Sequence, residues 1–174
     1  MGMDIYGNKA ENEKGEYFRN NVWWWRPLAN YILAEHFEIA SSCDTDEWHS
    51  NSGGGLDGEQ SLLLAKALRN DLETGRVAEY ERQYNEFLST LVREHCHLCE
   101  GTGIRTDRIG VEMEMPTKAL SPEMVSLTGR SHGTCNACGG VGTKENFNMS
   151  YPFTEDNVKE FTEFLTYCGG FRIC

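Results

Sequence analysis

Two copies of one eight-residue pattern constrain the fold of this chain more than any other feature of its sequence. Residues 96–103 read CHLCEGTG and residues 135–142 read CNACGGVG, so both copies spell C-x-x-C-x-G-x-G. Two residues between the cysteines let both thiolates reach one metal ion, at about 2.3 Å each. The glycines permit a tight turn after the second cysteine, where backbone amides can point at sulfur. The spacing therefore predicts two knuckles that meet around one ion.

The cysteines of the two knuckles form the predicted ligand set, which consists of Cys96, Cys99, Cys135 and Cys138. Four thiolates fill a tetrahedral shell and leave no position for water, which is typical of structural and not of catalytic zinc. We therefore expect one structural Zn²⁺ ion, held in a zinc-ribbon-like lobe over residues 96–142. The sequence leaves two alternatives open: a pair of redox dithiols, and substitute ligands among His95, His97 and His132.

The remaining cysteines, the first ten residues and the length of the apolar runs indicate the cellular compartment. Of seven cysteines in total, Cys43, Cys168 and Cys174 lie far apart without regular spacing. An odd number disfavours a secreted disulfide framework, and residues 1–10 lack the basic and apolar stretches of a secretory signal. The longest apolar runs have four residues, against the ~18 that a membrane span requires. We expect a cytoplasmic protein that is not inserted in a membrane.

The charge distribution restricts the class of partner. The chain has 16 basic and 27 acidic side chains, a net charge of −11, which argues against general binding to a phosphate backbone. Residues 101–144 are the exception, with five basic and four acidic side chains. A nucleic-acid contact is therefore expected only there, through the candidates Arg105, Arg108 and Arg130.

A run of three tryptophans followed by an arginine, WWWR at residues 23–26, is the second feature of interest. Three adjacent side chains cannot all face one core, because neither a helix nor a strand points successive residues the same way. We predict an aromatic wall for a protein partner or a planar ligand, with arginines beside it for anionic groups. The candidate residues are Arg19, Trp23, Trp24, Trp25 and Arg26. The alternative is that the tryptophans fix the N-terminal segment onto the helices.

The apolar periodicity predicts a single α+β domain over residues 1–174, mainly α, with about four helices. The first is expected from about Pro27 to Ala40, because proline fits a first helical turn. A capping-box pattern of Asp57 and Gln60 precedes the second, and Gly75 ends it.

The third predicted helix follows Gly75 directly, so we expect it to form an antiparallel hairpin with the second. The zinc lobe comes next, and the alternating residues 111–115 (VEMEM) predict a strand within it. Thr154 is the expected N-cap of the last helix, and residues 171–174 a closing strand.

The doubled motif resembles the zinc-finger region of DnaJ-type chaperones, which is built from repeated CxxCxGxG units. This resemblance covers residues 96–142 and implies zinc binding. It does not imply chaperone activity, because the chain has no His-Pro-Asp motif of a J domain. Those chaperones carry four repeats and this chain has two, so one zinc site is implied.

A wider resemblance covers nearly the whole chain. The segments MDIYG (3–7), YFRNNVWWWRPL (17–28), GLDG (55–58), YPF (151–153) and GGFRI (169–173), with the two knuckles, resemble an uncharacterised family of small phage and bacterial proteins. The resemblance to this family implies no particular activity. A phage origin would imply an accessory protein that works in the host cytoplasm, by binding a host protein or sequestering a host signal.

No catalytic signature stands out: the sequence has no G-x-S-x-G, no H-E-x-x-H and no zinc-deaminase motif. The sequence thus favours a small zinc-stabilised binding or accessory protein over an enzyme. Its expected target is a host protein or a small planar, nucleotide-like ligand. The alternatives are a nucleic-acid-contacting zinc-ribbon protein and a small hydrolase with an unrecognised site.

Overall fold

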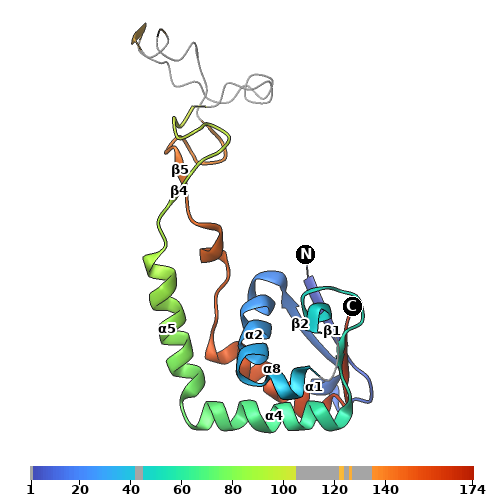
Figure 1. The fold of residues 1–174 in the computed structure, drawn as a ribbon. Helices are drawn as coiled ribbons and strands as arrows, with labels where there is room; N and C mark the ends of the chain where they lie inside the picture. The colour runs from blue at the N-terminus through green and yellow to red at the C-terminus, as the bar shows by residue number, and fades with distance from the viewer. Residues whose placement is uncertain (1, 42–44, 105–121, 124–125, 127–134) are drawn as a thin grey trace. The chain divides into compact units, whose positions relative to one another are not determined.

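The structure is a computed structural model that describes residues 2–41, 45–104, 122–123, 126 and 135–174 (Figure 1). The chain divides into two compact units: unit 1 comprises Met1–Thr90 and Ser150–Cys174, and unit 2 comprises Leu91–Met149. Helices predominate and a small antiparallel sheet accompanies them, so the predicted α+β, mainly α class is confirmed. In the part of the chain that the structure describes, no helix is long and apolar enough to cross a membrane.

Unit 1 contains a four-stranded antiparallel sheet in the order β2-β1-β6-β3. Its strands are β1 (Gly2–Gly7), β2 (Tyr17–Asn21), β3 (Gly55–Leu56) and β6 (Phe171–Ile173). Ile5 of β1 pairs with Phe18 of β2 and with Ile173 of β6, and all three side chains are buried. The predicted closing strand is therefore present, and it joins the two ends of the chain in one sheet.

The helices of unit 1 are α1 (Glu13–Glu16), α2 (Val22–Glu35), α3 (Phe37–Ala40), α4 (Gly58–Glu73), α5 (Arg76–Thr90) and α8 (Glu155–Tyr167). The predicted caps are confirmed. Asp57 and Gln60 form a capping box at α4, and the Thr154 side chain accepts from the Asn157 amide at α8. Gly75 has φ 76° and lies between α4 and α5, where a left-handed residue lets the chain change direction.

The first predicted helix was placed too late in the sequence. It begins at Val22 because the Asn21 side chain caps it, accepting from the amides of Trp23 and Trp24. Pro27 therefore lies inside α2 and not in its first turn. The helix ends at Glu35, and the short α3 follows after His36.

The predicted antiparallel hairpin of α4 and α5 is wrong. Figure 1 shows the two helices meeting at a corner and running in different directions. The side chains that hold the two helices account for the corner. The α4 helix packs mainly along α8, whereas Tyr80 of α5 lies against Tyr31 of α2 and Phe153, with ring centroids 4.8 and 4.7 Å apart.

An aromatic cluster forms the centre of unit 1. Trp25 is fully buried, and its ring centroid lies 5.4 Å from Phe161 and 6.0 Å from Trp48. Trp48 comes from a short 3-10 helix (Thr45–His49) and also contacts Phe171 of β6. Helix α2, the sheet and the segment before β3 are thus joined through one set of rings.

Unit 2 has a two-stranded antiparallel sheet, formed by β4 (Glu94–His95) and β5 (Thr143–Lys144). These strands bring the residues just before the first knuckle beside those just after the second. The predicted strand 111–115 lies outside the described residues. So do the predicted nucleic-acid contacts Arg105, Arg108 and Arg130.

Candidate metal centre

The four predicted ligands come together in unit 2. Their sulfur atoms all lie within 4.8 Å of one another. The Sγ atoms of Cys96 and Cys135 are 3.8 Å apart, and those of Cys99 and Cys138 are also 3.8 Å apart. A tetrahedron with metal–sulfur bonds of about 2.3 Å has edges of about 3.8 Å. The arrangement therefore fits one tetrahedral metal ion.

The two knuckles hold each other through the backbone in a nearly twofold-symmetric way. The amide of Cys96 donates to the carbonyl oxygen of Gly142 at 2.9 Å, and the amide of Cys135 donates to that of Gly103 at 2.8 Å. Each knuckle therefore binds the last glycine of the other. This exchange explains how the two knuckles keep their ligand geometry although 35 residues separate Cys99 from Cys135.

Backbone amides point at the sulfur atoms, as the motif predicts. The amide of Gly103 donates to Cys99 Sγ and the amide of Gly142 to Cys138 Sγ, both at 3.3 Å. Burial raises the pKa of the Cys138 thiol, but the amides of Gly142 and Gly140 outweigh it and bring the pKa to about 7. Donors placed at sulfur stabilise the thiolate, which is the form that binds a metal.

The last glycine of each knuckle is required by close packing as well as by the turn. Gly103 has φ 73°, and a Cβ there would lie 2.2 Å from the carbonyl oxygen of Gly140. Gly142 has φ 85°, and a Cβ there would lie 2.2 Å from that of Gly101. Any side chain at these positions would push the two knuckles apart.

The described cysteines and histidines outside this set take no part in it. Among the residues that the structure describes, the group that could hold a metal contains the four cysteines alone. His95 and His97 are exposed, and His132 lies outside the described residues. Cys168 is buried in unit 1 and Cys174 is exposed, whereas Cys43 is again outside the described part.

The predicted aromatic wall is divided among three places in unit 1. Trp25 belongs to the core, as described above. Trp23 packs against Tyr151 with ring centroids 4.9 Å apart, and Arg26 donates to the Tyr151 hydroxyl at 3.3 Å. Trp24 lines a hollow together with Arg19. The structure thus brings together two of the five predicted ligand-binding residues around one cavity.

This hollow, here the Trp24 hollow, has a volume of about 400 Å³ and lies at the beginning of α8. Its other polar walls include Asn20 and Asn157, which sequence reasoning missed. Asn20 Nδ2 donates to Asn157 Oδ1 at 2.8 Å, and Asn157 Nδ2 donates to the Trp24 carbonyl at 3.3 Å. The sequence did contain a sign of Asn20. It is a polar residue two positions after Phe18, and alternate residues of a strand lie on the same face, which in β2 is the buried one.

Comparisons of this chain with protein-family models, with curated proteins and with solved structures found no match.

Proposed function

We propose that this chain is a zinc-stabilised binding protein in which one Zn²⁺ ion, held by the four cysteines, maintains the fold of unit 2. The observation that carries the proposal is the set of four sulfur atoms within 4.8 Å of one another, with an amide donor on Cys99 and on Cys138. Sulfur-only tetrahedral sites suit zinc or iron. We favour zinc because a closed structural site requires no redox chemistry, and because the knuckles resemble those of DnaJ-type zinc fingers.

Unit 1 is the proposed binding part, and its charge limits what it binds. Unit 1 carries 20 acidic and 10 basic side chains, whereas unit 2 carries seven and six. A polyanion such as nucleic acid is repelled by such a surface. If the chain is phage-encoded, as the wider resemblance implies, a host protein with a basic surface is the macromolecular partner that this charge favours.

The Trp24 hollow argues for a small planar ligand more directly than the charge of unit 1 argues for a protein partner. Its volume falls in the ~300–1,000 Å³ range of small-molecule sites. Trp24 offers a ring for stacking, and Asn20 and Asn157 offer amide groups for the edge of a base. Asp156 and Glu160 also line the hollow and offset the charge of Arg19. We therefore propose a nucleobase or nucleoside, and not a polyphosphate, as its ligand.

A panel of nucleosides, titrated by calorimetry, tests this assignment. We expect at least one nucleoside to bind and Trp24→Ala to weaken it about tenfold or more, because stacking on an aromatic ring contributes ~1–3 kcal/mol per base. Trp23→Ala is the matched control, since Trp23 packs on Tyr151 and does not line the hollow. Equal losses in the two variants, or a panel without any binder, would contradict the assignment.

A further inference from the structure

A buried carboxylate with three partners lies where α2, α4 and α5 meet. The Asp71 side chain is 1% exposed. It accepts from the Tyr31 hydroxyl at 2.8 Å and from Arg76 Nη1 at 3.1 Å, and His36 Nε2 lies 2.7 Å from it. A carboxylate out of water is stable only with such partners. The cluster therefore fixes Arg76 and Tyr31 in place.

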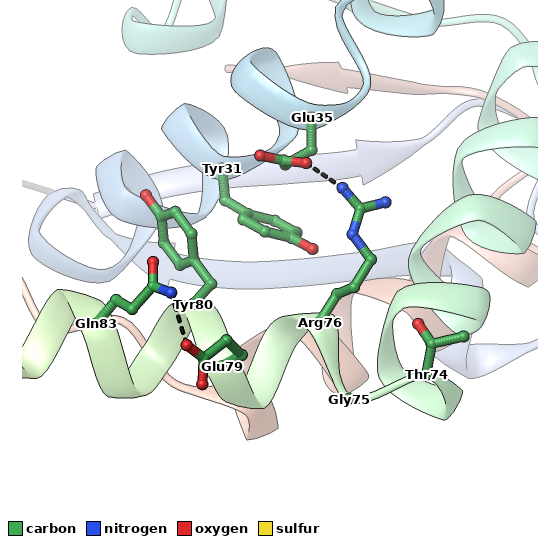
Figure 2. Close-up of a pocket in the computed structure, with 8 residues that line it drawn as sticks. All are labelled: Tyr31, Glu35, Thr74, Gly75, Arg76, Glu79, Tyr80 and Gln83. Carbon is green, nitrogen blue, oxygen red and sulfur yellow. Dashed lines mark hydrogen bonds and ion pairs between the residues drawn. The ribbon is translucent and has the colours of Figure 1, made fainter.

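A hollow of about 320 Å³ opens beside this cluster, here called the Tyr80 hollow (Figure 2). Its side-chain walls are Tyr31, Glu35, Arg76, Glu79, Tyr80 and Gln83. Figure 2 shows the rings of Tyr31 and Tyr80 between Glu35 of α2 and Glu79 of α5. Two aromatic rings thus lie between two carboxylates that come from different helices.

The charges around the Tyr80 hollow leave a negative excess. Among the described residues, Arg76 is the cation that lines it, and the guanidinium is already paired with Asp71 and Glu35. Glu79 adds a third carboxylate. Arg82, which does not line the hollow, donates to both of its oxygens at 2.7 and 2.9 Å, and Gln83 Nε2 donates to it at 2.6 Å. Burial and the nearby Glu35 carboxylate raise the pKa of Tyr80, consistent with a negative potential at its ring.

We propose that the Tyr80 hollow binds the guanidinium or ammonium group of a cationic ligand, placed against the partly exposed Tyr80 ring between Glu35 and Glu79. A cation near a tyrosine face gains from the ring quadrupole, and the flanking carboxylates add charge attraction. An anion would instead be repelled by the like charge of the three carboxylates. The volume suits one arginine-like chain. The site is independent of the metal centre and of the Trp24 hollow.

Calorimetric titration with agmatine and with the capped peptide Gly-Arg-Gly tests the proposal. The same peptide with citrulline in place of arginine is the neutral control of nearly equal shape. We expect agmatine and the arginine peptide to bind and the citrulline peptide to bind at least tenfold more weakly. Tighter binding of agmatine points to a free small molecule, and tighter binding of the peptide points to an arginine side chain of a partner protein.

Matched variants locate the binding on the protein. Glu79→Gln should weaken agmatine about two- to fivefold, in line with an ion pair at a solvent-exposed site. Glu86→Gln is the control, because Glu86 also pairs with Arg82 on α5 but does not line the hollow. Tyr80→Leu should weaken agmatine further, with circular dichroism to confirm that the variant is folded. Equal binding of the two peptides, an absence of agmatine binding, or equal losses at Glu79 and Glu86 would overturn the proposal.

Discussion

Replacing Cys99 with serine is expected to release the metal and unfold unit 2, while unit 1 keeps its fold. In the described residues of unit 2, the main buried cluster consists of the cysteines and Ala137. The described part of unit 2 therefore offers little apolar surface to replace the ion, and structural zinc supplies ~10–16 kcal/mol in small units of this kind. Amide NMR spectra should lose the dispersed resonances of residues 91–104 and 135–149 and keep those of unit 1.

Cys174→Ser is the control for this experiment, because Cys174 is exposed and lies far from the metal centre in sequence. It should retain the metal and the full set of resonances. A Cys99→Ser protein with an unchanged spectrum would show that something other than the ion holds the two knuckles together.

Replacing Trp25 with alanine should lower the free energy of unfolding of unit 1 by about 3–5 kcal/mol, the usual cost of removing a large core aromatic. Trp25 is fully buried against Trp48 and Phe161. Its indole Nε1 also donates to the Trp48 carbonyl, which the substitution would leave without this partner inside the core. Denaturant unfolding followed by far-ultraviolet circular dichroism gives the difference.

The neighbouring Trp24→Ala variant is the natural comparison. Trp24 is partly exposed at its hollow, so we expect a loss of about 1 kcal/mol or less. The two adjacent tryptophans should therefore differ by at least ~2 kcal/mol in the same measurement. Similar losses would contradict the division of the tryptophan run between the core and the Trp24 hollow.

The metal centre could be predicted because its determinants are local. Each pair of cysteines is fixed by a spacing of two residues, and the glycines that follow are readable in the sequence. The helix caps at Asp57 and Thr154 are also local, since each cap bonds to an amide three residues later. What the spacing did not reveal is the second role of Gly103 and Gly142, which each lie against the other knuckle.

One error concerned a local cap that was overlooked, and the other arose where distant residues decide the outcome. Pro27 suggested a helix start, but Asn21 caps the chain five residues earlier than predicted and Pro27 is accommodated inside α2. The corner between α4 and α5 follows from the packing of Tyr80 on Tyr31 and Phe153, which periodicity within α5 cannot show. The buried cluster around Asp71 did leave a sign in the sequence. Asp71 follows Leu64 and Leu68 at helical spacing, so a charged residue lies on the apolar face of α4.

X-ray absorption at the zinc edge, combined with metal analysis of the purified chain, identifies the ion and its ligands. We expect one zinc ion per chain in a shell of four sulfur atoms at about 2.3 Å, without nitrogen or oxygen ligands. A chain purified without bound metal, or a shell that contains histidine nitrogen, would contradict it.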